Sequence, residues 1–540
     1  MNEILTQNKK DNYFTGHFSN RLVFFVLEII IFIAGYWQIK NLGLYGDDWG
    51  ASTFLFHSDM NEAVKEWWQY GSGEISNFRM LAVMIPVLWF YAFKLFGLIG
   101  ISFLNFVVYL SLSYFLFLLL KQKISNSGTL FGALLFALYP TNNAYLWQVT
   151  MSYAIALLAV FAACLFFSKQ KWFLSLIFLL ISIFINEGVF FIFFISLLPS
   201  REEGFSWPIL KQKGMKWLVI VLGIVIIYVF FRVTFELKGI TGGNRTVSVL
   251  HNFNLAAYIF QFVKSYGVVL LISFSAAVWK IYFSFKIWHL AVGVAVFLLS
   301  FVLLNFSKTE WNQIKNRESL IVMLMGLMLI IAGRYYGFYY VPSINVLNLD
   351  TRYYFAASVG GAVFFAGFFE YLQQKLKYQK LIIILACTMF GMLAIFRFEV
   401  QKDYADSFKE AKNLWKQLVY SAPAVPENSL VVVNIPDKIL GKPVGLFEAA
   451  GDLRITTRKM YNKRVDFVSS PFIQHLKIDE RLVCLDSAPI YNSECFNKDK
   501  VYIFEWKNNQ LGQVAGTALQ AESGGVVQKI PDNFRRGILK

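Results

Sequence analysis

The sequence contains few charged residues for its length. Asp, Glu, Lys and Arg make up 16% of its 540 residues, whereas 57% are hydrophobic and 18% are aromatic. So small a polar share excludes an ordinary soluble globular protein. Repeated apolar runs of about 20 residues instead predict a polytopic α-helical membrane protein. The short alternating segments typical of a transmembrane β-barrel are not seen.

The sequence also lacks the short motifs of several enzyme classes. It contains no Walker A sequence, no Gly-x-Gly-x-x-Gly opening a helix, and no cysteine–histidine set with zinc spacing. It shows no internal repeat of the kind found in many transporters. The scattered histidines His57, His251, His289 and His475 are assigned no role.

Cysteine is scarce, with four residues in the chain. Cys164 and Cys387 lie inside apolar runs and are expected to be packing residues. Cys484 and Cys495 lie in a polar region near the end of the chain. If that region faces an oxidising compartment, we expect these two cysteines to form a disulfide bond.

The net charge of +16 does not indicate a nucleic-acid partner, because the basic residues cluster in short loops between apolar runs. That distribution encodes orientation in a membrane. Lys9, Lys10 and Arg21 precede the first apolar run, so we expect a cytoplasmic N-terminus and a multi-pass protein of the cytoplasmic membrane. The first run lacks a small-x-small cleavage site and is predicted to be an uncleaved anchor.

The alternation of basic loops predicts about eleven crossings and an extracytoplasmic C-terminus. Two apolar stretches are ambiguous: 80–97 is interfacial or re-entrant, and 255–278 either does not cross or forms a hairpin. Additional crossings within these stretches would raise the number to thirteen. The eleven predicted spans are 22–39, 100–120, 128–140, 149–167, 172–185, 188–199, 216–236, 288–306, 318–337, 354–373 and 379–397.

Composition changes sharply near residue 400. The remaining residues hold 16 of the 34 acidic residues and no long apolar run. Strand-like runs occur at 430–434 and 501–506. We therefore expect a transmembrane module at 1–399, with outer loops at 41–98 and 238–287, and a soluble extracytoplasmic α/β domain at 400–540.

Two adjacent carboxylates, Asp47 and Asp48, lie on a glycine-flanked stretch directly after the first predicted span. The neighbouring Tyr45 and Trp49 favour the membrane–water interface. Such a pair is suited to binding a divalent cation through oxygen ligands or to acting as a general base. The alternative interpretation is a solvated interfacial turn.

The other unusual polar residues also fall at predicted outer helix ends: Arg79, Glu187, Asp350 and Arg352. Charges at such positions are costly, and a cluster of them usually marks a site. Arginine for a phosphate and carboxylates for a metal or a proton suit a phosphate-linked substrate. The alternatives are a solvated hairpin acid for Glu187, an interfacial anchor for Arg352, and the simple start of an apolar stretch for Arg79.

The order of these features resembles the GT-C glycosyltransferases, integral membrane enzymes that use polyprenyl-phosphate sugars. Asp47 and Asp48 stand where that superfamily has its acidic motif. Asn77-Phe-Arg79, followed by Phe93-Lys-Leu-Phe-Gly97, looks like the segment that often follows it. Asp350-Thr-Arg352-Tyr353 is similar to a late outer-loop motif, and Val431-Val-Val-Asn-Ile-Pro-Asp437 to outer domains of some members. Met80 stands where a Pro-rich stretch is expected, and the Trp-Trp-Asp motif of oligosaccharyltransferases is absent.

The resemblance implies an inverting transfer of a sugar from a polyprenyl phosphate to an envelope glycan, lipid or protein at the outer membrane face. Asp47 or Asp48 would act as the base or hold Mg²⁺ or Mn²⁺. Arg79, Glu187, Asp350, Arg352 and Tyr353 would bind substrate. The rival hypotheses are a transporter for lipid-linked sugars and a non-catalytic protein of envelope assembly.

Overall fold

The protein is a polytopic helical membrane protein, as the sequence predicts. The computed structural model describes residues 20–44, 55, 59–62, 64–65, 81, 84–146, 150–198, 207–237, 255–307, 316–334, 349–422, 424–435, 465–469, 476–478, 481–485, 495–507, 510–513 and 527–529. Seven helices within these residues are long and apolar enough to cross a membrane: Leu98–Lys121, Met151–Ser168, Lys211–Phe231, Ile259–Ser284, His289–Phe306, Phe355–Lys375 and Gln379–Ser421.

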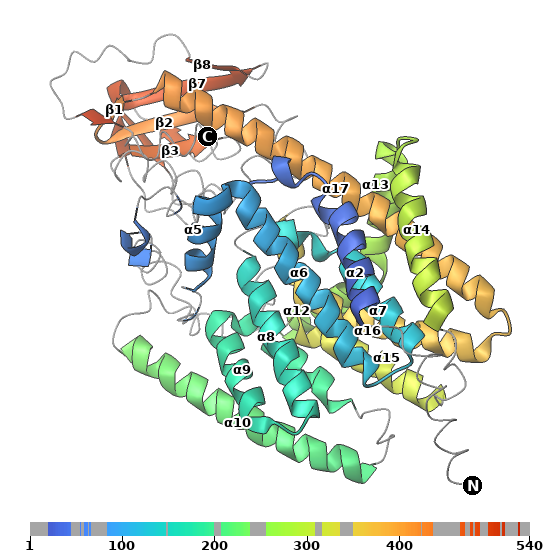
Figure 1. Ribbon diagram of the computed structural model, residues 1–540. Helices are drawn as coiled ribbons and strands as arrows, with labels where there is room; N and C mark the ends of the chain where they lie inside the picture. Colours follow the sequence, from blue (N-terminus) through green and yellow to red (C-terminus); the bar gives the residue numbers. More distant parts are fainter. Residues whose placement is uncertain are drawn as a thin grey trace, which may run out of the picture.

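Each of the eleven predicted spans has a helical counterpart (Figure 1). In chain order they are α2 (Asn20–Ile31) with the π-helical η1 (Phe32–Tyr36), α6 (Leu98–Lys121), α7 (Asn126–Leu138), α8 (Met151–Ser168), α9 (Trp172–Ile185), the 3₁₀ helix η6 (Glu187–Leu197), α10 (Trp207–Leu237), α14 (His289–Phe306), α15 (Asn316–Ala332), α16 (Phe355–Lys375) and α17 (Gln379–Ser421). The short 3₁₀ helices between them include η2 (Ile39–Asn41), η5 (Asn142–Leu146) and η10 (Leu349–Tyr354).

The two ambiguous stretches are also helical. Within 80–97, α5 (Met84–Phe96) packs against α6. Within 238–287, α12 (Leu255–Gly267), the π-helical η7 (Val268–Ile272) and α13 (Ser273–Ser284) follow one another as one continuous helical segment. The predicted alternative of a hairpin at 255–278 is therefore wrong, because a hairpin needs a turn where η7 continues the helix.

The last helix, α17, differs most from its prediction. It does not end at 397 but continues to Ser421, so the predicted domain boundary at 399 lies inside a helix. Beyond residue 400 its buried apolar side chains recur every three or four residues, which is the pattern of an amphipathic helix. They include Tyr404, Phe408, Ala411, Trp415 and Leu418. Charged residues between them produce the change in composition that the sequence analysis reads as a boundary.

The backbones of helices α15 and α16 approach one another closely at glycine residues. Gly326 and Gly333 on α15 and its C-terminal end, and Gly360 and Gly367 on α16, are each spaced by seven residues. A Cβ at Gly360 would lie 2.3 Å from the backbone nitrogen of Ile330. Small residues allow such close approach between helices in a membrane protein. The packing fixes the end of α15 against the start of α16.

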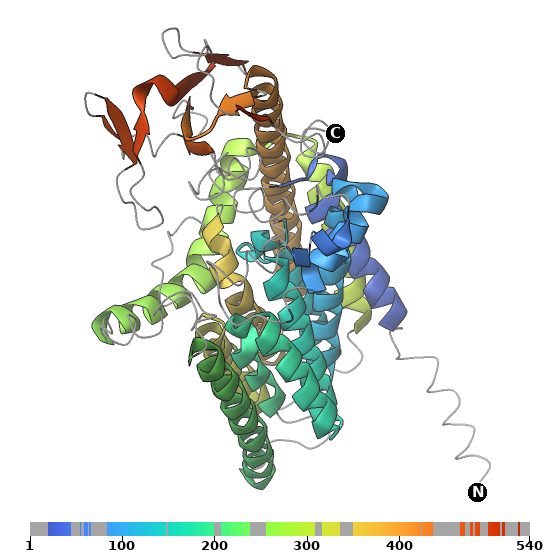
Figure 2. The ribbon, with the colours of Figure 1, turned by 90° about the vertical axis from the view of Figure 1, so that its left-hand side faces the viewer.

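The strands gather beyond one end of the helices, where α17 ends (Figures 1 and 2). One sheet has the order β3-β2-β7-β8, with β3 (Val465–Ser469), β2 (Ser429–Asn434) and β7 (Val501–Lys507) parallel and β8 (Gln510–Gln513) antiparallel. A second sheet is formed by β4 (Leu476–Ile478), β5 (Leu482–Leu485) and β6 (Cys495–Asn497). Strand β1 (Ala424–Pro426) pairs with β9 (Val527–Lys529). The predicted strands at 430–434 and 501–506 are confirmed.

Alternating side chains of β2 pack on two different layers. Val431 and Val433 belong to the same apolar core as Trp415 of α17. Leu430 and Val432 form a separate cluster with side chains of the second sheet. The strand thus lies between α17 and the smaller sheet, as the period of two of a β-strand allows.

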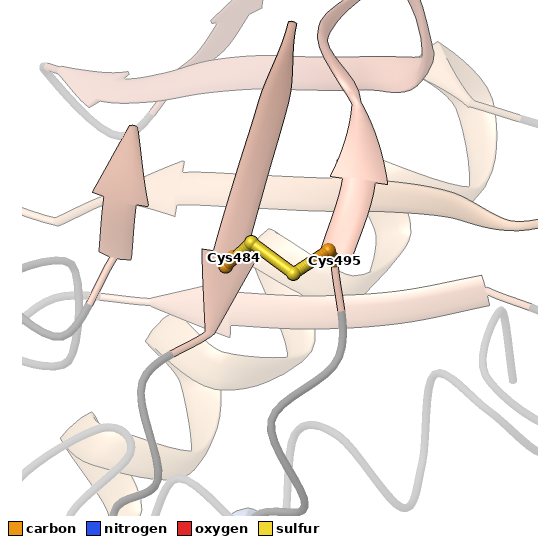
Figure 3. The surroundings of a disulfide bond; sticks show 2 residues. All are labelled: Cys484 and Cys495. Atoms are coloured by element: carbon orange, nitrogen blue, oxygen red, sulfur yellow. A yellow bond between two sulfur atoms is a disulfide. The ribbon is translucent and has the colours of Figure 1, made fainter. Parts of the chain in front are cut away.

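The predicted disulfide is present, since Cys484 of β5 is joined to Cys495 of β6 (Figure 3). The two residues are also opposite one another in the antiparallel pairing of these strands. Cys164 and Cys387 are buried and unpaired, as expected for packing residues. Both expectations about the cysteines are confirmed.

Candidate functional site

The two ends of the helical bundle are distinguished by their connections. At one end, Lys123 donates a hydrogen bond to the carbonyl of Leu198 at 2.5 Å, and the amide of Ser125 donates to Glu370 at 3.2 Å. These bonds join the turn after α6 to the ends of η6 and α16. We call this the basic end, and the opposite end the η10 end.

Glu187 is the first residue of η6 and lies towards the η10 end. Helix η6 ends next to Leu198 at the basic end and extends roughly 22 Å from there at the 3₁₀ rise per residue. Glu187 is only 9% exposed. The preceding Asn186 caps the helix, accepting from the amide of Gly188 at 2.9 Å, and its side chain lies 3.4 Å from the hydroxyl of Ser152 in α8. Glu187 is thus shielded from water, as the sequence led us to expect.

Asp350, Arg352 and Tyr353 lie together in η10, directly before α16. Helix η10 packs against η5, the turn that follows α7. The side chains of Asp350 and Arg352 lie outside the described part of the structure, whereas the ring of Tyr353 is half-buried. The backbone therefore brings these three predicted residues to one corner of the bundle.

The sequence analysis missed Arg334, which lies two residues beyond the end of α15 and is 1% exposed. Its guanidinium lies over the ring of Tyr354 at 4.4 Å and near that of Tyr353 at 6.0 Å. Its Nη1 also donates to the carbonyl of Tyr353 at 3.4 Å. A signal was present, because Arg334 falls inside the predicted span 318–337, where a charge is costly and usually functional.

The position of Arg334 follows from the helix packing described above. A Cβ at Gly333 would lie 2.4 Å from the backbone nitrogen of Ala357, so only glycine permits this approach. This contact packs the end of α15 against the first turn of α16. Because η10 directly precedes α16, the next residue, Arg334, meets the tyrosines of η10.

A second buried arginine, Arg397 of α17, has a different environment. Its Nη1 donates to the carbonyls of Tyr139 at 3.1 Å and Asn142 at 3.0 Å. The Asn142 amide and the Tyr109 hydroxyl bond the carbonyl of Phe136 at 2.9 and 3.1 Å. These groups bond carbonyls at and just beyond the C-terminal end of α7, where the helical ladder of backbone bonds ends. The carbonyls of Phe136 and Tyr139 also accept from the backbone amides of Tyr139 and Asn142. Arg397 therefore serves the structure of this helix end.

Two pairs of polar side chains join α17 to α13 and α14. Nε2 of His289 lies 2.7 Å from Oε1 of Glu399, and Nζ of Lys280 lies 2.7 Å from Oδ2 of Asp403. Nδ1 of His289 accepts from the amide of Lys286 at 3.0 Å, so the ring proton is on Nε2, facing Glu399. These pairs fasten neighbouring elements together.

Asp47, Asp48 and Arg79 lie outside the described residues. The structure describes the chain leading to the acidic pair as far as Leu44, which is buried. Within the described residues no group of three or more His, Cys, Asp or Glu is placed to hold a metal ion. The expected binding of Mg²⁺ or Mn²⁺ at Asp47 and Asp48 thus stays a prediction.

The comparisons with known proteins assign the chain to no family, because no family model and no curated protein matches it significantly. The chemistry of the η10 end is therefore the basis for assigning a function. There, a buried arginine stacked on tyrosines, the η10 segment with Arg352, and a shielded glutamate lie on elements of one bundle. The planar edge of a guanidinium is the part of arginine that binds phosphate or carboxylate.

Proposed function

We propose that this protein is a membrane glycosyltransferase of the GT-C type. It would transfer a sugar from a polyprenyl-phosphate donor to a polar acceptor of the cell envelope, at the outer face of the cytoplasmic membrane. The single observation that carries the proposal is the contact of Arg334 with the η10 segment. It adds a second arginine to the corner where the sequence predicts a phosphate site at Arg352.

In this proposal the arginines bind the phosphate of the donor. Arg352 and Arg334 neutralise the charge that grows on the phosphate as the sugar leaves, and Tyr353 holds the Arg334 guanidinium in place. Charge-assisted bonds from arginine to phosphate are among the stronger hydrogen bonds in proteins. Glu187, Asp350 and Arg79 complete the binding of donor or acceptor.

The reaction needs little else from the protein. A carboxylate of Asp47 or Asp48 takes the proton of the acceptor hydroxyl, whose oxygen attacks the anomeric carbon from the face opposite the phosphate. The bond from that carbon to the phosphate oxygen breaks, and the product is inverted. The phosphate leaves as polyprenyl monophosphate. A divalent metal held by the acidic pair is the alternative role for these carboxylates, and chelation before the assay separates the two.

The orientation proposed places the basic end in the cytoplasm and the η10 end and the strands outside. Eleven crossings follow if α5 and the continuous segment α12 to α13 do not cross. The disulfide in the strand region supports this orientation, because disulfides persist in oxidising compartments. A reporter fused after Phe398 is expected to be active outside the cytoplasm, and one within 201–214 inside. The opposite result would place the proposed site on the cytoplasmic face of the membrane and contradict the proposal.

The direct test uses purified full-length protein in lipid nanodiscs. The donor is a lipid extract from source cells grown on a tritiated sugar, and the acceptor is their envelope fraction. We expect label to move from the lipid phase to the acceptor and polyprenyl monophosphate to appear. The matched control is the Asp47→Asn, Asp48→Asn double variant, which is expected to leave the label on lipid.

The two rival functions give different results in related assays. In sealed proteoliposomes, labelled lipid that changes leaflet without losing its sugar would indicate a transporter. Envelope defects on gene deletion that the double Asn variant fully corrects would indicate a non-catalytic assembly protein. Either outcome would contradict the glycosyltransferase proposal.

A further inference from the structure

The chain between the first helix and the acidic stretch is held by α17. Gln401 is fully buried, with 0% exposure. Its Nε2 donates to the carbonyl of Ala34 at 3.4 Å, and its Oε1 accepts from the amide of Gln38. One side chain thus bonds a backbone acceptor and a backbone donor on the same segment, four residues apart.

These two bonds fall where the first helix is irregular. Ala34 lies within the π-helical η1, and Gln38 lies beyond its end, just before η2. A π-helical turn disturbs the regular ladder of backbone bonds, and such turns occur frequently at functional sites. At this irregularity Gln401 provides hydrogen-bond partners for the carbonyl of Ala34 and the amide of Gln38. Its amide therefore sets the direction in which the chain leaves the first helix.

A second contact lies further along the same two segments. A Cβ at Gly43 would lie 2.2 Å from Cε2 of Phe408, so the Phe408 ring rests directly on the Gly43 backbone. The neighbours of Gly43, Leu42 and Leu44, are both buried. Phe408 follows Gln401 by two helical turns and lies on the same face of α17. The two contacts hold the segment 34–44 along about 10 Å of this helix.

The end of α17 holds the strand region in a similar way. The side-chain oxygen of Gln417 accepts from the amide of Leu511 in β8 at 2.5 Å. Trp415 and Leu418 share an apolar core with β2 and β7. One continuous helix therefore carries both the approach to the acidic stretch and the sheet.

We propose that Gln401 and Phe408 are positioning residues for the segment 34–44, which leads to the acidic stretch, and that α17 links the position of this segment to the strand region. The position of the segment stands on described contacts, while its effect on turnover rests on the proposed function. Neither residue contacts the reacting groups in this proposal. They act through the chain segment that they hold.

The experiment measures the position of the segment directly. Spin labels are placed on full-length protein carrying Asn41→Cys and Tyr420→Cys, both at exposed positions. Tyr420 lies about 28 Å beyond Gln401 along the helix, a separation suited to double electron–electron resonance. The native cysteines do not interfere, because two are buried and two form the disulfide.

Two variants of Gln401 separate its two bonds. Gln401→Met has a similar shape and removes both, whereas Gln401→Glu keeps the oxygen that accepts from Gln38. We expect a single narrow distance distribution in the parent, a broad or shifted one with Gln401→Met, and an intermediate one with Gln401→Glu. Asp406→Asn, on the exposed side of α17, is the matched control and should leave the distribution unchanged.

The proposal is overturned if Gln401→Met gives the distance distribution of the parent while its thermal unfolding shows that the variant is folded. In the sugar-transfer assay, Gln401→Met should lower kcat by roughly ten- to a hundredfold, with KM for the lipid donor unchanged, because misplacement by about 1 Å has such effects. An altered distribution in a protein without any transfer activity would leave the positioning role standing and remove the proposed function. Normal kcat with an altered distribution would overturn the link to catalysis.

Discussion

The two ends of the bundle use buried charges in different ways. At the basic end, Lys123 meets the carbonyl at the C-terminal end of η6, and Glu370 meets the amide before α7. Each charge faces the end of a helix whose dipole has the opposite sign. At the η10 end, Arg397 does the same for the carbonyls after α7. Arg334 instead lies over tyrosine rings.

This difference teaches how to sort buried charges in a membrane protein. Charge and burial do not distinguish Arg334 from Arg397, because both are arginines and both are 1% exposed. A cation bound to helix-end carbonyls has its donors directed at the backbone, so its loss leaves buried acceptors without their bonds. Arg334 makes one bond of this kind, to the carbonyl of Tyr353, and lies over Tyr354 at 4.4 Å, closer than Arg397 lies to Tyr109 at 5.6 Å. We therefore expect the loss of Arg397 to cost more stability, and we propose Arg334 as the arginine that binds the donor phosphate.

The largest effect expected from this comparison is on stability. Arg397→Met should destabilise the folded protein by about 4 kcal/mol, because two hydrogen bonds from a charged group, to the carbonyls of Tyr139 and Asn142, are lost. Lys123→Met, at the basic end, removes the donor of one carbonyl and should cost about half as much. Unfolding of both variants by a denaturing detergent measures the free energies. An Arg397→Met protein as stable as the parent but inactive would move Arg397 into the site.

The next effect concerns the acidic stretch, to which the proposed function gives the catalytic base. Asp47→Asn and Asp48→Asn keep the side-chain size and remove the charge. We expect one of them, in our interpretation Asp47, to lower turnover by about 10²-fold, the usual scale for a general base. The other should cost about tenfold. Full sugar transfer by both single variants and the double variant would place the catalytic base elsewhere.

The sequence predicted the helices well because apolar runs between basic turns follow directly from the cost of burying charge in lipid. It failed where charge and helix coincide. Residues 402–409 of α17 alternate charged side chains with an apolar stripe, so a low average hydropathy concealed a continuous helix. Arg334 was overlooked at a span end, since its tyrosine partners lie some twenty residues away and meet it only through the α15–α16 packing. The burial of Glu187 was predicted correctly, because its two apolar flanks indicate it locally.

A smaller effect concerns the strand region beyond the η10 end. Replacing Cys484 and Cys495 together by Ala should destabilise that region by about 2–3 kcal/mol, the loop-closure contribution expected for so short a loop. Limited proteolysis should then cut the strand region faster, with the helical bundle still intact. Thiol labelling at both positions in unfolded, non-reduced parent protein would contradict the bond and weaken the proposed orientation.

The smallest effect is the sharpest test of the comparison. Arg334→Lys keeps the positive charge but loses the planar group that stacks on Tyr354 and presents a two-donor edge. We expect KM for the polyprenyl-phosphate donor to rise about tenfold, or about 1.4 kcal/mol, with kcat little changed and stability within about 1 kcal/mol of the parent. Arg317→Lys, in the first turn of the same helix at the basic end, is the matched control and should leave KM unaltered. If Arg334→Lys lowers stability as strongly as Arg397→Met while donor binding is retained, the two arginines serve the same structural role. The phosphate of the donor would then bind elsewhere than at the η10 end.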